Sequence, residues 1–232
     1  MKGVVVVTGA ARGIGKTISE KLAATGPFTV IGVDLSPDLA DNEAIVPVQI
    51  DLTSDDGPET VLRSIEDQGL PLLGLVNNAG ITRDARLINM GDDDFRSVIE
   101  VNLGAAFRLT EALAPSMETG GSVVNIASRA YLGNFGQFNY SMSKGGVVGL
   151  TRALAISLAP DVRVNAIAPG LIATEMSMAI PEDIREKMVD AIPLGRMGEP
   201  EEIADAVWYL LSPLSSYVTG HVLVVGGGRS LT

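Results

Sequence analysis

The sequence predicts a doubly wound α/β fold, in which a parallel sheet is covered by helices on both faces. Short apolar runs rich in valine and isoleucine alternate with longer segments of helical spacing almost to the end of the chain. Hydrophobic residues make up 46% of the 232 residues, enough for one large core, and 26 glycines suit many strand–helix turns. No repeat or linker divides the chain, so we expect a single domain over residues 1–232.

The strands are identified by their apolar runs. Gly3–Thr8 contains consecutive valines and is typical of a strand that is buried on both faces. The helix that follows should stop near Gly26-Pro27. Pro47 cannot donate a hydrogen bond within a sheet, so the strand that contains it should lie at an edge. The other strands are expected at Phe28–Val33, Ala44–Ile50, Leu72–Val76, Ser122–Ala127, Val162–Ala168 and Val222–Val225.

Long helices and one irregular segment complete the predicted fold. We expect helices at roughly Asp92–Met117 and Gln137–Leu158, and a third around Glu201–Leu211. The segment 171–200 has no clear strand character, carries four methionines and is bounded by Pro169-Gly170 and a second glycine–proline turn. We interpret it as a cover over a ligand site, although methionines also fill irregular gaps in cores.

Composition excludes several classes of function. Acidic residues outnumber basic ones, 28 to 17, and the net charge of −11 disfavours nucleic acid or an anionic membrane as a partner. There is no cysteine and only one histidine, so no metal site and no Ser-His-Asp triad are expected. The apolar run at the start is too short for a signal peptide, and no stretch approaches a membrane span. We expect a cytoplasmic protein.

A glycine-rich turn follows the first predicted strand. Gly9, Gly13 and Gly15 have the spacing G-x-x-x-G-x-G, which lets backbone amides approach a pyrophosphate at the N-terminus of a helix. Asp34 ends the second strand, where a carboxylate can hold the 2′-hydroxyl of an adenosine ribose. The alternatives are a tight structural turn and an ordinary solvated aspartate. The position between the first strand and helix of an alternating chain favours a dinucleotide site.

Tyr140 and Lys144 are four residues apart on a predicted helix, so they share one face. A free tyrosine is a poor base at neutral pH, but a nearby ammonium group stabilises the phenolate and lowers the pKa of the tyrosine. Ser128 ends the fifth strand, at the carboxyl edge of the sheet where open α/β folds bind ligands. A Tyr–Lys pair with this spacing is by itself common and usually structural.

Taken together, these residues resemble the short-chain dehydrogenase/reductase family, and the resemblance covers nearly the whole chain. Asn77-Asn78-Ala79-Gly80 matches the N-N-A-G motif of the family. Pro169-Gly170, with Ile172 and Thr174, matches the segment that lies beside the nicotinamide. Asn102, Ser128, Tyr140 and Lys144 match the catalytic tetrad in order. The resemblance implies a single-domain Rossmann fold with a parallel seven-stranded sheet of order 3-2-1-4-5-6-7.

The resemblance also assigns roles to residues. It implies that Tyr140 is the general acid/base, that Lys144 lowers its pKa and binds the nicotinamide ribose, and that Ser128 orients the reacting oxygen. Asn102 is expected to support a water in a proton relay. The residues expected to contact the cofactor are Gly9, Arg12, Gly13, Ile14, Gly15, Asp34, Asp51, Leu52, Asn78, Ala79, Gly80, Tyr140, Lys144, Pro169, Gly170, Ile172 and Thr174.

Within the family, Gly80–Asp84 and Arg196–Pro200 look most like 3-oxoacyl-thioester reductases. Ser128 stands twelve residues before Tyr140, one fewer than in many members. Asp34 differs from the residues usual in the NADPH-using acyl-carrier reductases and would repel a 2′-phosphate, so we expect NAD rather than NADP. Arg12 in the glycine turn argues against that expectation, because a basic residue there could reach a 2′-phosphate.

The expected substrate is a small molecule, a 3-oxoacyl or 3-hydroxyacyl thioester, and an acyl-CoA is favoured over a carrier-protein-bound chain. An acidic carrier protein needs exposed cations, and the turns at 117–121 and 158–161 contain no Lys or Arg. Arg129 and Arg163 lie nearby and could compensate in part. The alternatives are a secondary alcohol, polyol or steroid dehydrogenase, and a dinucleotide-binding sensor without turnover. By resemblance we expect a homotetramer, with Gly145, Gly146 and Gly149 allowing helices of two subunits to approach closely.

Overall fold

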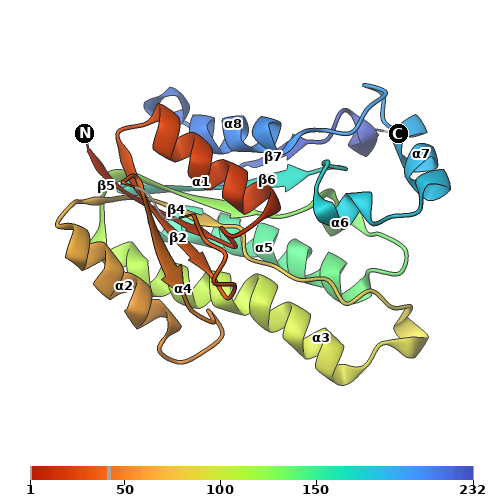
Figure 1. The fold of residues 1–232 in the computed structure, drawn as a ribbon, viewed down its shortest axis with the longest axis horizontal. Helices are drawn as coiled ribbons and strands as arrows, with labels where there is room; N and C mark the ends of the chain where they lie inside the picture. Colours follow the sequence, from red (N-terminus) through yellow and green to blue (C-terminus); the bar gives the residue numbers. More distant parts are fainter. Residues whose placement is uncertain (1, 41–42, 232) are drawn as a thin grey trace.

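The computed structural model describes residues 2–40 and 43–231. Its centre is one sheet of seven parallel strands in the order β3-β2-β1-β4-β5-β6-β7 (Figure 1). The expected order is thus confirmed, and β3, which contains Pro47, lies at an edge. The strands are β1 Gly3–Thr8, β2 Phe28–Asp34, β3 Ile45–Gln49, β4 Leu72–Asn77, β5 Met117–Ile126, β6 Val162–Pro169 and β7 Val222–Val225.

Helices cover both faces of the sheet (Figure 1). Neighbouring valines of β1 point to opposite faces, so Val5 packs in the core beneath α1 and α8, and Val4 packs in the core beneath α2, α4 and α5. This is why β1 contains four consecutive valines rather than alternating apolar and polar residues. The helices are α1 Gly13–Thr25, α2 Gly57–Gln68, α3 Asp92–Ile99, α4 Ala105–Leu113, α5 Phe138–Ser157, α6 Glu175–Met178, α7 Glu182–Asp190 and α8 Pro200–Leu211.

The expected helix over Asp92–Met117 is the main difference between prediction and structure. It is divided into α3, a π-helical turn at Glu100–Gly104 and α4, and a 3-10 turn at Ala114–Ser116 ends it. Met117 instead begins β5, which starts earlier than the predicted Ser122 because Leu72 of β4 pairs with Met117 across a register shift. A π-helical turn widens a helix locally and is frequent at functional sites.

The segment expected to cover a site contains α6 and α7. It begins at the carboxyl end of β6, and Figure 1 shows both helices beyond the end of the sheet. Ile172 and Gly198 form a single β-bridge that closes the base of the segment. The cover is thus anchored at its base beside the carboxyl ends of the strands, where open α/β folds bind ligands.

Candidate active site

The glycine turn adopts a conformation that needs glycine. Gly9 and Gly13 have φ angles of +66° and +52°, a region that side chains disfavour. A Cβ on Gly15 would overlap the carbonyl oxygen of Gly9 and lie 2.5 Å from Asn78 Nδ2. Helix α1 begins here with no side chain capping its first turn, so backbone N–H groups are left for a phosphate. Ile14 is half-buried and packs against the core, whereas Arg12 is exposed.

Asp34 lies at the end of β2, next to this turn. Its Oδ2 accepts a hydrogen bond from Ala11 N at 3.0 Å, and its Oδ1 accepts one from Ser36 N at 2.9 Å. These bonds fix the carboxylate beside the turn and leave each oxygen a further acceptor position. That arrangement fits two ribose hydroxyl groups.

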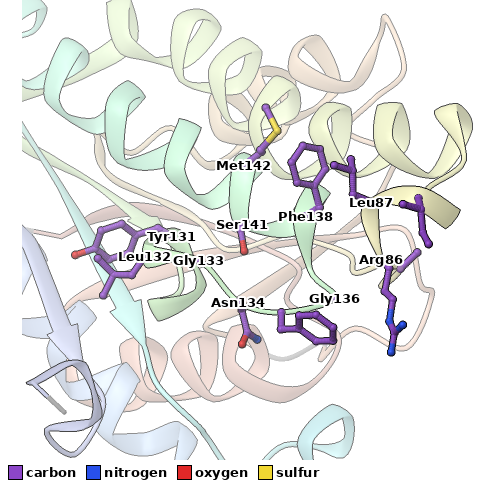
Figure 2. A pocket seen from close by; sticks show the side chains of 13 residues that line it. Arg86, Leu87, Tyr131, Leu132, Gly133, Asn134, Gly136, Phe138, Ser141 and Met142 are labelled. Carbon is purple, nitrogen blue, oxygen red and sulfur yellow. The ribbon is translucent and has the colours of Figure 1, made fainter.

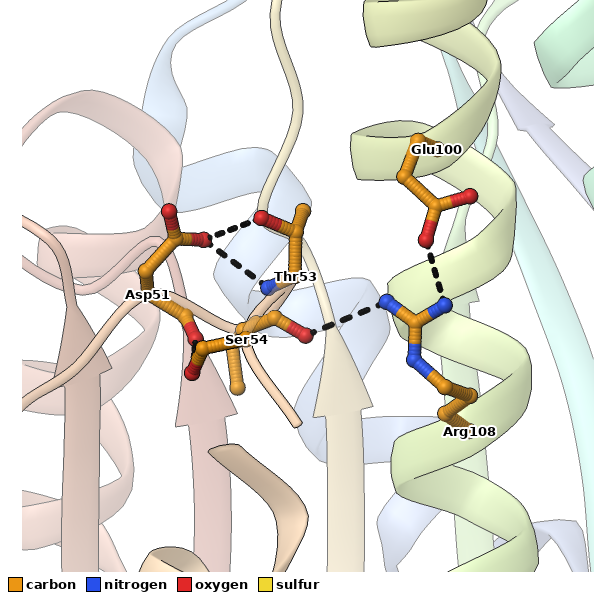
Figure 3. Close-up of polar contacts among 6 residues, drawn as sticks. Asp51, Thr53, Ser54, Glu100 and Arg108 are labelled. Atoms are coloured by element: carbon orange, nitrogen blue, oxygen red, sulfur yellow. Dashed lines mark hydrogen bonds and ion pairs between the residues drawn. The ribbon is translucent and has the colours of Figure 1, made fainter. Parts of the chain in front are cut away.

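Asp51 and Leu52 follow β3 at the same edge of the sheet, and Ile50 N donates to Asp34 O at 2.9 Å. Thr53 donates two hydrogen bonds to Asp51 Oδ1, through its side chain at 2.7 Å and its backbone at 2.8 Å (Figure 3). These bonds lower the pKa of Asp51. Figure 3 also shows Arg108 between Glu100 and this loop, where its guanidinium donates to Leu52 O at 3.5 Å. The structure therefore places Asp51 and Leu52 at the same edge of the sheet as Asp34.

The turn after β4 is locked onto the glycine turn. Thr8 Oγ1 accepts the backbone N–H groups of Asn78 and Ala79, at 2.9 and 3.0 Å. Asn78 Nδ2 donates to Thr8 O at 2.9 Å and to Gly9 O at 3.2 Å. A Cβ on Gly80 would lie 3.2 Å from Asn102 Oδ1 and 3.6 Å from Lys144 Nζ, so the turn reaches from the phosphate side of the site to the tetrad.

Asn102 lies in the π-helical turn and is buried. Its Oδ1 accepts a hydrogen bond from Ile81 N at 2.8 Å, and its Nδ2 donates to Ile81 O and to Ser143 Oγ, both at 3.0 Å. The side chain therefore joins the turn after β4 to α5, next to Lys144. Both amide hydrogens are used, so only oxygen lone pairs remain to hold a water.

Ser128 and Tyr140 meet at the start of α5. Ser128 forms a side-chain hydrogen bond with Tyr140, which lowers the pKa of the phenol, but the burial of Tyr140 outweighs this bond and raises the pKa overall. The negative charge of Asp84 raises it further. Ser128 Oγ also accepts a hydrogen bond from Ala130 N at 3.1 Å, which fixes the hydroxyl at the end of β5.

Lys144 is almost fully buried below Tyr140. Its Nζ donates to Ile126 O at 2.8 Å and lies 5.6 Å from the centre of the Tyr140 ring. Burial lowers the pKa of Lys144 to about 8, because the charged form loses its hydration. The amine of Lys144 is thus held over the phenol ring, and its lowered pKa makes the charged and neutral forms both accessible near neutral pH.

The segment after β6 faces the glycine turn. A Cβ on Gly13 would lie 3.8 Å from Thr174 Cγ2, so Thr174 stands across the turn from α1. Gly170 N donates to Val225 O, and a Cβ on Gly170 would lie 2.7 Å from Gly226, so only glycine fits after Pro169. Ile172 is buried, and its carbonyl accepts from Ser177 Oγ at 2.5 Å, which fixes the start of the cover.

Comparison with known proteins identifies the family. Residues 9–230 match the family profile described as Enoyl-(Acyl carrier protein) reductase. The chain is 42% identical to the 3-oxoacyl-[acyl-carrier-protein] reductase FabG of Thermotoga maritima, over 97% of this chain and 96% of that protein. It is 40% identical to nodulation protein G of Azospirillum brasilense, over 97% of each. The chain belongs to the short-chain dehydrogenase/reductase family.

Solved structures agree with the family assignment. A short-chain dehydrogenase/reductase of Brucella melitensis, described as a glucose/ribitol dehydrogenase, has a TM-score of 0.92 and 34% identity, over 98% of this chain and 96% of that one. A short chain dehydrogenase family protein of Francisella tularensis has a TM-score of 0.92 and 27% identity over all of both chains. The protein is therefore a nicotinamide-nucleotide-dependent oxidoreductase that interconverts a hydroxyl group and a ketone.

The structure also reveals residues of the short-chain dehydrogenase site that sequence reasoning missed. Asn139 is fully buried; its Oδ1 accepts Tyr140 N at 2.7 Å and its Nδ2 donates to Arg83 O at 2.9 Å. Gln137 Nε2 donates to Asp84 Oδ2 at 2.8 Å. These bonds tie the loop after β4 to the N-terminus of α5 and so position Tyr140. The signal in the sequence is the pair of amide side chains, Gln137 and Asn139, within the three residues before Tyr140.

A hollow of about 740 Å³ lies beside the start of α5 in the short-chain dehydrogenase fold. Figure 2 shows Leu87, Phe138 and Met142 around it, with Tyr131 and Leu132 on the other side. Ile88 and Phe135, which also line it, are 86% and 84% exposed.

The described residues contain no cluster of side chains suited to a metal ion, and no described helix is long and apolar enough to cross a membrane.

Proposed function

We propose that this protein interconverts 3-oxoacyl and 3-hydroxyacyl thioesters, with Tyr140 transferring the proton. The observation that carries the proposal is the meeting of three side chains: Ser128 interacts with the phenol of Tyr140, and the buried Nζ of Lys144 lies 5.6 Å from the centre of the Tyr140 ring. The names of similar reductases, including the Thermotoga protein above, supply the acyl substrate class. A single domain over residues 1–232, with the segment 171–200 as its cover, is part of the proposal, and the cytoplasmic location expected from the sequence stays a prediction.

Each of the four tetrad residues has its own proposed role. In the reductive direction Ser128 would donate a hydrogen bond to the carbonyl oxygen, and Tyr140 Oη would give that oxygen its proton. A nicotinamide held in the site would supply the hydride. The raised pKa of Tyr140 keeps the phenol protonated and ready to donate at neutral pH. Lys144 offers a positive charge to the phenolate that remains and a donor to the nicotinamide ribose. Asn102 holds the loops around Lys144 and supports a water through its remaining acceptor positions.

The cofactor would lie along the carboxyl edge of the sheet. Gly9, Gly13 and Gly15, with Arg12 and Ile14, would hold its pyrophosphate; Asp34, Asp51 and Leu52 would hold its adenosine. The N-N-A-G turn and the segment from Pro169 to Thr174 would flank the rest. The uncapped first turn of α1 and the close packing at Gly15 fit this assignment.

A coenzyme A ester is the proposed form of the thioester. Arg163, which was a candidate cation for docking an acidic carrier protein, is engaged inside the chain: its guanidinium donates to Ser215 Oγ at 2.9 Å and to the carbonyl groups of Ser212 and Val218. Burial lowers the pKa of Arg163. The segments 117–121 and 158–161 contain no Lys or Arg that could replace it.

Rates with three substrates test this proposal. Acetoacetyl-CoA should be reduced faster than the same acyl group on its carrier protein and faster than a cyclic ketone. If the carrier-bound substrate is preferred by tenfold or more in kcat/KM, the docking argument is wrong. Activity on simple ketones alone would favour the second candidate, a secondary alcohol or polyol dehydrogenase, which the glucose/ribitol dehydrogenase name of the Brucella protein supports.

NAD(H) is the proposed cofactor, and kcat/KM with NADH should exceed that with NADPH by about tenfold or more. The fixed carboxylate of Asp34 accepts hydrogen bonds from ribose hydroxyls and repels a 2′-phosphate. Asp34→Ser should reduce the ratio of the two kcat/KM values, with Asp38→Ser on the following exposed turn as the matched control. A wild-type preference for NADPH would mean that Arg12 outweighs Asp34.

The proposed assembly is a homotetramer in which α3, α4 and α5 face a second subunit. A Cβ on Gly145 or Gly149 would meet nothing within 4 Å, whereas one on Gly146 would lie 2.6 Å from Leu103, so Gly146 packs inside the chain instead. Ile156, near the C-terminal end of α5, is 82% exposed.

Gly149→Phe is expected to leave the fold intact and to shift the protein to smaller species. The substitution meets no atom of its own chain but blocks the approach of a second helix. Light scattering at micromolar concentration measures the mass, and Glu20→Phe on the exposed surface of α1 serves as the control. A wild-type monomer would contradict the proposed assembly.

A further inference from the structure

A second hollow, of about 570 Å³, has Arg129 in its lining. Arg129 directly follows Ser128, so its side chain starts one Cα step, about 3.8 Å, from the residue that would hold the reacting oxygen. The opposite wall comes from the end of α7 and from the C-terminal segment. The lining residues are Arg129, Asp190, Ala191, Pro193 and Arg229.

Three consecutive glycines, Gly226 to Gly228, directly precede Arg229. Gly227 and Gly228 have φ angles of +60° and +88°, and a Cβ on them would lie 2.6 Å from Ile192 and 3.0 Å from Pro193. Leu194 N donates to Gly227 O at 3.1 Å. The C-terminal segment therefore packs directly on the residues after α7, and this contact brings Arg229 to the same hollow as Arg129.

Two arginines and one carboxylate line the hollow. The Nε of Arg129 is buried and has no hydrogen-bond partner among the described residues. Burial lowers the pKa of Arg229, and the like charge of Arg129 lowers it further, so the two guanidinium groups are close enough to repel. Asp190 is the one carboxylate among the lining residues, and within the described chain it forms no salt bridge with Arg129.

We propose that this hollow binds an anionic group of the substrate, a carboxylate or a phosphate. Guanidinium groups present planar, paired donors that match both anions, and an anion would supply the acceptor that Arg129 Nε lacks. This inference rests on the proposed function for the position of the reacting oxygen at Ser128. The carboxylate would come from a short oxo acid and the phosphate from a coenzyme A ester.

Paired substrates test the proposal and separate the two sources. Acetoacetate is compared with its neutral ethyl ester, and acetoacetyl-CoA with the neutral acetoacetyl thioester of N-acetylcysteamine. In Arg129→Gln, kcat/KM should fall about tenfold more for the anionic member of a pair than for the neutral one. A selective loss in the first pair identifies a carboxylate, and a selective loss in the second identifies a phosphate. Arg129→Lys, which keeps the charge, should recover part of the loss.

Arg63→Gln is the matched control, because it removes the same charge from the exposed surface of α2. It should leave the ratio within each pair unchanged. Calorimetric titration with inorganic phosphate gives a readout that does not depend on turnover, and its affinity should fall in Arg129→Gln. Equal ratios and equal phosphate affinity in wild type and Arg129→Gln would overturn the anion site. Turnover of acetoacetate without turnover of either thioester would overturn the thioester proposal and leave the anion site to be judged on the first pair.

Discussion

Tyr140→Phe is expected to lower kcat by about three orders of magnitude while the Kd of the nicotinamide cofactor stays within about threefold of wild type. The substitution removes only the phenolic hydroxyl group, which bonds to Ser128 and is proposed to give or take the substrate proton. The ring remains to fill its place at the start of α5. Steady-state kinetics and fluorescence titration of the cofactor measure the two effects separately.

Tyr209→Phe provides the matched control, because Tyr209 lies on α8, which packs on the other face of the sheet from α5. It should change neither kcat nor the Kd of the cofactor. A Tyr140→Phe enzyme that kept most of its kcat would show that another group transfers the proton, and the role proposed for Tyr140 would be wrong.

The raised pKa of Tyr140 indicates which direction of the reaction the site favours near neutral pH. The sequence predicts that Lys144 lowers this pKa, yet in the structure the burial of the phenol dominates and raises it. Burial, Ser128 and Asp84 account for the shift of this pKa, although Lys144 Nζ lies over the Tyr140 ring and donates to Ile126 O. A protonated phenol at neutral pH suits ketone reduction, whereas oxidation of the alcohol requires the phenolate and should gain rate as the pH rises.

The sequence allowed some parts of this site to be predicted because they depend on local pattern. The glycine spacing at Gly9–Gly15, the valine run of β1 and the edge position of Pro47 each follow from short-range rules, and the structure contains all three. The order of the strands followed from the family resemblance, since no local rule fixes the way parallel strands are arranged.

Other parts depend on contacts between distant segments and were not predictable locally. The π-helical turn at Asn102 forms where its side chain bonds to Ile81 and Ser143, and a helical pattern in the sequence contains neither partner. The same reason explains why Gly146 was grouped with Gly145 and Gly149, although it packs against Leu103. Likewise, Arg163 looked free in the sequence but is engaged by the segment around Ser215.

Lys144→Met is expected to weaken both catalysis and cofactor binding, with kcat reduced by about a hundredfold and the Kd of the cofactor raised by about tenfold. Methionine keeps the length of the side chain but removes the charge and the hydrogen-bond donors. Lys144 is proposed to contact both the phenolate of Tyr140 and the nicotinamide ribose, so its loss should affect two measurements that Tyr140→Phe separates. A normal cofactor Kd in Lys144→Met would contradict the proposed contact with the ribose.

Lys144→Met should also remove a pH-dependent destabilisation of the folded protein. The pKa of Lys144 is about 8 in the folded chain against 10.5 for an unperturbed lysine, so the unfolded chain binds more protons between these values. The free-energy cost of burying the ammonium group is therefore complete below pH 8 and disappears as the pH rises through about 10.5. The shift in pKa corresponds to about 3 kcal/mol.

Urea unfolding at pH 7 and pH 10 should show the free energy of unfolding of wild type rising by about 2 kcal/mol relative to Lys144→Met. Lys16→Met, at an exposed lysine of α1, should show no such change. A difference between wild type and Lys144→Met that is independent of pH would mean that the buried amine is already neutral at pH 7, and the electrostatic role proposed for it would be wrong.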